Sequence, residues 1–217
     1  LGLGLVKKSP HLRNLARSYV SKRRSNRYMT QAYTLPIQDN MVLFESFFGR
    51  SYSCSPKAIY KAMLQDSRFE NYTFVWAFRD PEKYADNPDF ERAILVKSKS
   101  QLYYQYYAQA KYWFTNSRAY DWISKKDQQV YVQCWHGTPW KRLGLDIKVD
   151  TKSALNTTQD IWDKYIYEGK LHDWLLSPSP YTTERLSSAF GHADHSKIIE
   201  RGYPRNDYLF NYTKEEA

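Results

Sequence analysis

The chain has 217 residues, 42% of them hydrophobic, and a formal net charge of +9 at pH 7. This length suffices for one sizeable core, and two cysteines, Cys54 and Cys134, are too few for a disulfide framework and favour a reducing compartment. No apolar run is long enough to cross a bilayer. The positive charge predicts an anionic partner, which is nucleic acid, a membrane surface or a phosphate-rich substrate.

The first 36 residues are strongly basic. Eight basic residues and no acidic one precede Asp39. Leu5, Leu12, Leu15 and Tyr19 are spaced so that they can form the apolar face of a short helix. We expect residues 1–36 to form a basic arm outside the core that binds an anionic membrane surface, where each basic residue contributes on the order of 1 kcal/mol. The alternative is a solvated tail or a linker.

Apolar runs of strand length follow the arm and are rich in β-branched and aromatic residues. They span residues 41–47, 72–78, 93–98, 112–117, 130–135, 174–179 and 197–204. Segments that can form helices separate many of them, at residues 56–65, 99–110 and 181–189. Strands alternating with helices predict an α/β fold over residues 37–217, a Rossmann-like parallel sheet with helices on both faces.

Two further segments carry weaker signals. Residues 145–171 predict only a polar loop that passes into a helix near Trp162 and Tyr165. The tyrosines of "QLYYQYYAQAKYW" are expected mainly to pack in the core rather than to bind nucleic acid.

Polar segments follow the predicted strands, where ligands of open α/β sheets bind. In "GRSYSCSP", after the first strand, small residues and free backbone N–H groups ahead of a helix suit a phosphate. The candidate phosphate-binding residues of this loop are Gly49, Ser51, Ser53 and Ser55. The alternative is a tight turn in which Ser55 and Pro56 start the helix. Asn116, after the fourth strand, either orients a substrate or His136, or simply begins a helix.

The stretch "VYVQCWHGTPWKRLG" places His136 at the end of the fifth strand. An imidazole there can take a proton from a hydroxyl, while Gly137 and Thr138 form a stiff turn with Pro139 that lets a ligand approach. The two cations that follow, Lys141 and Arg142, can hold a phosphate and favour the neutral imidazole. From spacing alone, a histidine that only hydrogen-bonds a neighbouring carbonyl is an equal alternative.

Metal and cofactor sites are not predicted. His192 and His195 lack a convincing third ligand and are expected to be solvated loop histidines. Neither cysteine has a partner at catalytic spacing, so both are expected to pack in the structure.

Three segments, in order, resemble the CDP-glycerol glycerophosphotransferase family, the teichoic-acid polymerases and primases of Gram-positive bacteria. "CWHGTPWKRLGLDI" resembles the W-H-G-T-P-x-K-x-L-G signature, "VLFESFFGRSYSCSPKAIYKAM" the opening strand, loop and helix, and "RGYPRNDYL" the segment that closes the first domain. Together they cover the chain from Met41 to Leu209. The resemblance implies the acceptor-side, N-terminal half of a GT-B fold, with the second, donor-binding domain absent from this chain.

The resemblance also implies a reaction and its partners. His136 corresponds to the general base that takes the proton of the acceptor's terminal hydroxyl as it attacks CDP-glycerol and expels CMP. The acceptor is a lipid-linked polyol-phosphate polymer at the inner face of the cell membrane, so the protein is expected to be cytoplasmic and peripheral. In "RGYPRND", Arg201, Arg205 and Asp207 are expected to form an ion-pair lock, with Gly202 and Pro204 shaping the turn.

Two other functions stay open from the sequence. One is a non-catalytic module that binds a polyanion through the same basic surface. The other is transfer of ribitol phosphate from CDP-ribitol. A polyanion-binding module requires no neutral base in a stiff turn, so His136 favours an enzyme, and nucleic acid is not expected as the partner. The isolated segment is expected to be inactive.

Overall fold

The computed structural model describes residues 10–148 and 157–211, which form a sheet of seven strands that all run parallel. The strands are β1 (Gln38–Glu45), β2 (Thr73–Phe78), β3 (Ala93–Lys97), β4 (Ala110–Thr115), β5 (Val130–Gln133), β6 (Trp174–Ser177) and β7 (Ile198–Glu200). Each coincides with one of the predicted runs. The predicted α/β fold with a parallel sheet is therefore confirmed.

The strand order is β3-β2-β1-β4-β5-β6-β7, so the direction of winding reverses between β1 and β4. These two strands pair directly, with Phe44 opposite Phe114 and Glu45 opposite Thr115. The loops that leave them at the carboxyl edge diverge at this point, which is where open α/β sheets bind ligands. β5 lies next to β4, and His136 follows β5.

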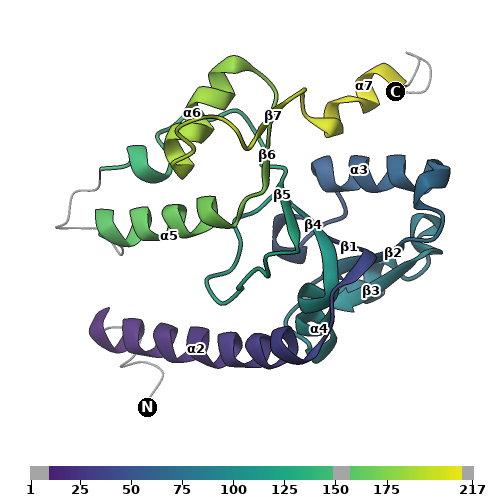
Figure 1. The fold of residues 1–217 in the computed structure, drawn as a ribbon, viewed down its shortest axis with the longest axis horizontal. Helices are drawn as coiled ribbons and strands as arrows, with labels where there is room; N and C mark the ends of the chain where they lie inside the picture. Colours follow the sequence, from purple (N-terminus) through teal and green to yellow (C-terminus); the bar gives the residue numbers. More distant parts are fainter. Residues whose placement is uncertain (1–9, 149–156, 212–217) are drawn as a thin grey trace.

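Helices cover both faces of the sheet, as predicted (Figure 1). They are α2 (Pro10–Thr34), α3 (Cys54–Gln65), α4 (Gln101–Gln109), α5 (Thr158–Leu171), α6 (Pro180–Phe190) and the short α7 (Tyr208–Asn211). Alternate residues of β1 separate the two faces, because Leu43 packs with α2 and α4 whereas Phe44 packs with α3.

Aromatic side chains fill both layers. On the α3 face, the ring of Trp76 stacks on Phe44 at 5.2 Å and on Phe78 at 5.5 Å between centroids. On the other face, Tyr103 and Tyr107 are buried around Trp122. The expectation that the tyrosine-rich segment packs in the core is confirmed.

Helix α2 differs from the expected arm. Its first part exposes Leu15 and Tyr19, but Tyr28 is fully buried in the core and its hydroxyl donates to the carbonyl of Ser124 at 2.7 Å. Met29 and Ala32 pack against the same core. The expectation that this segment lies outside the core is wrong, because one face of its C-terminal part packs onto α4. Leu5 lies outside the described residues.

A tight contact joins the loop after β5 to α5 and α6. Gly144 begins the short helix η5 (Gly144–Asp146) with φ +48°, and a Cβ there would overlap the carbonyl oxygen of Ala189 and the ring of Tyr165. We expect Gly144→Ala to lower the free energy of unfolding by ~3 kcal/mol, through overpacking and the left-handed backbone. Urea denaturation measures this loss. Gly137→Ala is the matched control, because nothing lies within 4 Å of its Cβ position; an equal loss in both variants would contradict the contact.

Candidate active site

Asn116, directly after β4, joins the loops that follow β1 and β5. Its side-chain Oδ1 accepts the backbone N–H of Phe47 at 2.7 Å, and its carbonyl oxygen lies 2.6 Å from Nδ1 of His136. Asn116 is completely buried, and its Nδ2 has no partner within the described chain. The structure thus brings two of the candidate residues, Asn116 and His136, into direct contact at the switch point of the sheet.

This contact defines the protonation of the His136 ring. A carbonyl oxygen only accepts hydrogen bonds, so Nδ1 of His136 must carry the proton that Asn116 receives. In the neutral imidazole, Nε2 then keeps its lone pair. The ring stacks on Trp135 at 4.3 Å and meets the edge of Phe47 at 5.9 Å, while the residue as a whole is exposed. The geometry provides an oriented base at the surface.

Strained backbone surrounds this base. Phe47, Phe48, Cys54 and Trp135 all have φ between +48° and +64°, a left-handed conformation that costs such residues roughly 1–2 kcal/mol each. They lie in the loops after β1 and β5. Backbone strain persists only where the surrounding structure holds it, and it clusters at functional sites. Here the hydrogen bond from Phe47 to Asn116 is one of the contacts that hold the strained backbone.

The serine loop after β1 is held by its own hydrogen bonds. Ser46 Oγ donates to the carbonyl of Ser53 at 2.8 Å, and the hydroxyls of Ser51 and Ser53 are 2.8 Å apart. Gly49 has φ +74° and accepts the N–H of Arg79 at 2.7 Å. The turn is therefore structural, while the hydroxyls of Ser51 and Ser53 remain half-exposed at its surface.

The start of α3 differs from the expected one. Ser53, not Ser55, is the N-cap, and its side chain makes no capping hydrogen bond. Ser55 is fully buried and its Oγ has no partner within the described residues. The hydroxyl of Ser55 is therefore not exposed to a ligand from the surface.

Lys141 and Arg142 lie beyond the turn that follows His136. Both are exposed and line a neighbouring groove with Tyr181 and Arg185, whose lining does not include His136. Gly137 and Thr138 lie next to the base in the chain. Thr138 is exposed, and the Cβ side of Gly137 is open.

Arg205 takes a different role from the expected ion-pair lock. Its guanidinium donates to the carbonyl of His136 at 2.9 Å, contacts Cys54 Sγ at 3.6 Å and lies over the ring of Tyr203. Within the described residues it makes no ion pair with Asp207, whose N–H bonds to the carbonyl of Pro204. Within the described chain the contacts of Arg205 are thus with backbone, sulfur and ring groups, and not with a carboxylate.

The turn before Arg205 has the predicted form. Gly202 has φ +95°, and Pro204 begins the 3-10 helix η6 (Pro204–Asn206). This helix packs on α3. The segment from Gly202 to Asp207 therefore ties the His136 loop to the start of α3.

A buried polar network behind β5 was not predicted. Glu168 Oε1 accepts from Tyr131 at 2.9 Å, from Gln133 at 3.1 Å and from His172 at 3.1 Å. Gln133 Oε1 in turn accepts the N–H of Trp135 at 3.0 Å. The network therefore holds the residue that precedes His136. Only the i,i+4 spacing of Glu168 and His172 could have indicated it, because the other partners are distant in sequence.

The same network corrects the expectation for His192. This residue is buried, and its Nε2 lies 3.1 Å from Nδ1 of His172. Burial, followed by the charge of His172, lowers the pKa of His192 to about 4. His195 is exposed, as expected. Within the described chain no three His, Cys, Asp or Glu residues are grouped to hold a metal ion.

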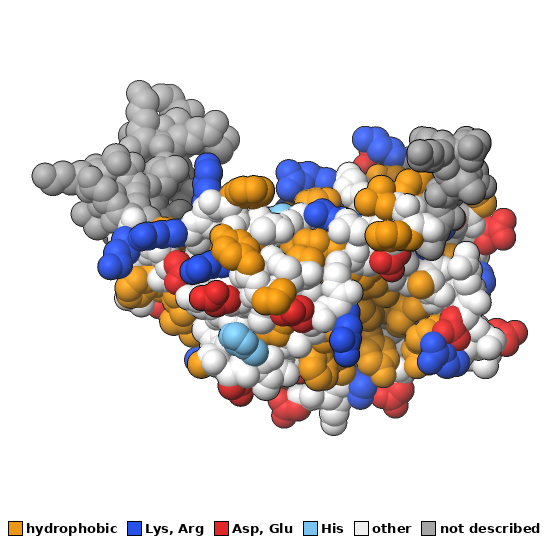
Figure 2. All heavy atoms as spheres, turned by 90° about the horizontal axis from the view of Figure 1, so that it is seen from above, with side chains coloured by type: hydrophobic (Ala, Val, Ile, Leu, Met, Phe, Trp, Pro, Cys, Tyr) orange, Lys and Arg blue, Asp and Glu red, His pale blue; other side chains and the backbone are white. Residues whose placement is uncertain are grey.

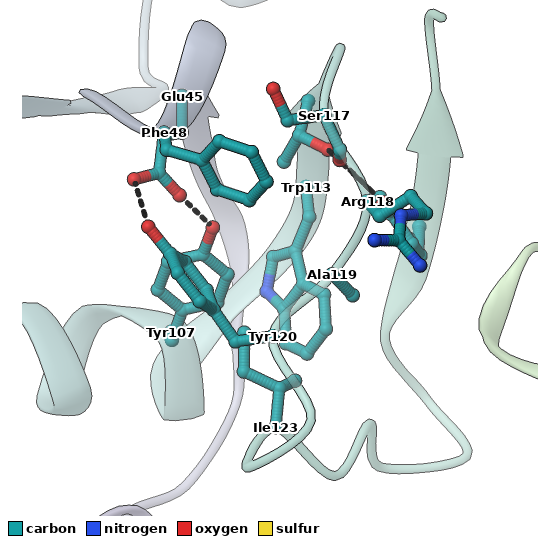
Figure 3. A pocket seen from close by; sticks show the side chains of 11 residues that line it. Glu45, Phe48, Tyr107, Trp113, Ser117, Arg118, Ala119, Tyr120 and Ile123 are labelled. Carbon is teal, nitrogen blue, oxygen red and sulfur yellow. Dashed lines mark hydrogen bonds between the residues drawn. The ribbon is translucent and has the colours of Figure 1, made fainter. Parts of the chain in front are cut away.

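A second buried carboxylate lies at the end of β1. Glu45 accepts hydrogen bonds from Tyr107 at 2.6 Å and Tyr120 at 3.4 Å, beside a cavity of about 10 Å³ (Figure 3). It also accepts one from Tyr103 at 3.0 Å. Burial raises the pKa of Glu45 to about 7, against the opposing effect of the three hydroxyls and of Lys99. Glu45 is therefore largely protonated in mildly acid solution.

The raised pKa of Glu45 predicts how stability depends on pH. The unfolded carboxyl ionises near its ordinary pKa of 4.5 and the folded one near 7. The contribution of Glu45 to the free energy of unfolding is therefore fully present below pH 4.5 and is lost as pH rises to 7, by about 3 kcal/mol in all. Unfolding free energies from pH 4.5 to 8 should show wild type losing stability relative to Glu45→Gln. Parallel curves for the two proteins would contradict the assignment.

The family profile of CDP-glycerol:poly(glycerophosphate) glycerophosphotransferases matches residues 27–217. The chain belongs to this family. This chain is 37% identical over 206 residues to a teichoic acid poly(glycerol phosphate) polymerase of Staphylococcus epidermidis and 35% identical over 214 residues to one of Bacillus subtilis. These matches cover 95% and 98% of this chain, which spans 28% of the length of each relative.

Solved structures agree with the family assignment. A structure of the wall teichoic acid polymerase TagF superposes with a TM-score of 0.78 at 36% identity, covering 95% of this chain and 49% of that one. A variant of that polymerase soaked with CDPG gives a TM-score of 0.76 at 37% identity, covering 92% of this chain and 48% of that one. This chain thus shares the fold of about half the length of each of these polymerase structures.

Proposed function

We propose that this glycerophosphotransferase chain is the acceptor side of an enzyme that transfers glycerol phosphate from CDP-glycerol to a growing teichoic-acid-like or capsule polymer. The observation that carries the proposal is the bond from His136 Nδ1 to the carbonyl of Asn116, which leaves an exposed Nε2 as a base. Membership of the family supports the substrate class. The relatives are teichoic acid poly(glycerol phosphate) polymerases.

The reaction follows from the position of His136. Nε2 takes the proton of the acceptor's terminal hydroxyl while that oxygen forms a bond to the glycerol-bearing phosphorus of the donor. The bond between this phosphorus and the oxygen that bridges the two phosphates breaks, and CMP leaves with the electron pair. Asn116 stabilises the imidazolium that forms, because its carbonyl accepts the Nδ1 proton throughout.

Other candidate residues have supporting roles in this proposal. Asn116 positions the base, because it bonds both the His136 ring and the N–H of Phe47. The surface hydroxyls of Ser51 and Ser53 lie at the start of α3, where backbone N–H groups favour an acceptor phosphate. Gly137 and Thr138 leave room beside the base.

The donor would be held mostly by a second domain of the GT-B type. The surface from Gly202 to Asp207 is its proposed docking site, continued by the exposed side chains of Tyr208, Leu209 and Phe210. Arg205 bonds the carbonyl of His136, so docking there would act directly on the base. The acceptor domain of the same proposal spans residues 37–217 together with the C-terminal part of α2, which packs in its core.

The anionic membrane surface is the proposed location of the reaction, with the enzyme peripheral at its inner, cytoplasmic face. Helix α2 supports this, because exposed Leu15, Tyr19 and Val20 precede exposed Lys22 and Arg23. In the described ranges no helix combines the length and the apolar character needed to cross a membrane. A lipid-linked acceptor would be presented at this surface.

The test is CMP release from CDP-glycerol by the longest natural chain containing this sequence, with and without a lipid-linked glycerol-phosphate acceptor. The proposal predicts release only with acceptor, matched by elongation of the acceptor. Release of CMP from CDP-ribitol but not from CDP-glycerol would identify CDP-ribitol as the donor. Binding of the acceptor polymer without release from any CDP donor would replace the enzyme by a polyanion-binding module.

A further inference from the structure

A groove of about 520 Å³ lies beside the proposed site. Its walls are the loop that follows β5, from Pro139 to Lys148, and the first turns of α6, with Tyr181 and Arg185. Because α6 follows β6 directly, both walls lie at the carboxyl edge of the sheet, as His136 does. A volume of this size fits a ligand much larger than one phosphate.

The groove is strongly cationic. Among the described residues, one carboxylate, that of Asp146, and four basic side chains line it: Lys141, Arg142, Lys148 and Arg185. Asp146 already accepts the hydroxyl of Ser188 at 2.6 Å. Within the described residues no carboxylate lies within ion-pair distance of Lys141, Arg142 or Lys148, and Arg185 has only Glu184 at 3.8 Å.

Aromatic side chains complete the groove and fix it to the His136 loop. Trp140 is 93% exposed, although a large aromatic ring is usually buried. The Tyr181 hydroxyl donates to the carbonyl of Pro139 at 3.3 Å, and the guanidinium of Arg185 lies 5.4 Å from the Tyr181 ring. These contacts join α6 to the turn that begins at His136.

The groove is adjacent to the proposed base but separate from it. Pro139 is three positions after His136 and lines the groove, whereas His136 does not. Figure 2, which looks onto the edge where α3, α6 and α7 lie in Figure 1, shows Lys and Arg side chains interspersed with hydrophobic ones. A ligand in the groove would therefore be held some distance from the reacting hydroxyl.

We propose that this groove is a subsite for internal phosphodiester units of the polyol-phosphate acceptor, behind the unit whose terminal hydroxyl reaches His136. The inference rests on the proposed function and adds the place where the chain is held. Dispersed cations match a repeating phosphodiester, and exposed Trp140 and Tyr181 offer ring faces to the polyol carbons. A donor diphosphate must instead lie within reach of the attacking hydroxyl.

The experiment compares acceptors of two lengths in the longest natural chain that contains this sequence. A single glycerol-phosphate unit on a soluble lipid analogue reaches only the base, whereas a long oligomer also reaches the groove. For Lys148→Ala/Arg185→Ala we expect the ratio of kcat/KM for the long to the short acceptor to fall ~10-fold, through KM of the long one. The control is Lys164→Ala/Lys170→Ala, which removes two exposed charges from α5.

The outcomes separate the subsite from the function. A ratio unchanged in the groove variant, or lowered equally in the control, overturns the subsite. A rise in KM for CDP-glycerol with equal losses for both acceptors assigns the groove to the donor and also overturns it. If wild type releases no CMP, the proposed function fails, and direct binding of the oligomer then tests the subsite. Loss of binding in the groove variant but not in the control supports the subsite, whereas equal binding to wild type and the groove variant overturns it.

Discussion

Replacing His136 with alanine should lower kcat for CMP release by about 10²- to 10⁴-fold, the usual contribution of a positioned general base. The bond from Nδ1 to the Asn116 carbonyl orients the ring and leaves Nε2 as the acceptor of the proton. Alanine removes the proton acceptor without disturbing a core, since His136 is exposed. Steady-state release of CMP with saturating acceptor measures the effect.

Two controls make the His136 result specific. Binding of the acceptor polymer to His136→Ala should stay within a few-fold of wild type, because the proposed phosphate contacts lie on other residues. His195→Ala removes an exposed histidine far along the chain, and its kcat should equal that of wild type. Equal kcat for wild type and His136→Ala would remove His136 from the chemistry.

Replacing Glu168 with alanine should lower the free energy of unfolding by about 3–5 kcal/mol, as expected when one partner of a buried charged network is removed. The change leaves the hydroxyl of Tyr131 and the ring of His172 without their acceptor in the core. It also frees Gln133, which holds the N–H of Trp135. Urea denaturation at neutral pH measures the loss.

The matched control for this stability effect is Glu184→Ala. Glu184 is an exposed glutamate on α6 whose one ion pair among the described residues is with Arg185 at 3.8 Å, so we expect a change within about 0.5 kcal/mol. If Glu168→Ala is no less stable than Glu184→Ala, the buried network does not contribute to the fold as its geometry indicates.

The strands were predictable because parallel strands are buried on both faces and appear as continuous apolar runs. β1 shows this directly, with Met41, Val42, Leu43 and Phe44 all buried. Once the strands were placed, the general binding edge of parallel sheets placed His136 and Asn116 near a common site. Their direct contact adds what the sequence could not give, the proton on Nδ1.

The remaining features depend on contacts between distant residues. Glu168 meets Tyr131 and Gln133 only because α5 packs behind β5, and no local pattern records that pairing. The burial of Tyr28 was likewise not predictable, because this residue lies in a strongly basic segment. Its burial follows only from the packing of α2 on α4.

Lys141 and Arg142 show that closeness in sequence does not fix where a side chain lies relative to His136. They follow His136 by five and six positions, yet the turn through Pro139 carries them into the groove against α6. That these residues bind phosphate stays a prediction, which in our proposal concerns internal units of the acceptor. Arg205, distant in sequence, contacts His136 instead.

The protonation state of the His136 ring decides whether this residue can act as the base. Nitrogen NMR of the natural chain with labelled histidine, with the His136 signals assigned by their loss in His136→Ala, reports the state of both ring nitrogens at neutral pH. We expect a proton on Nδ1, bonded to the Asn116 carbonyl, and a lone pair on Nε2. A neutral ring with its proton on Nε2 would exclude His136 as the base, because Nε2 could then take no proton from an acceptor hydroxyl.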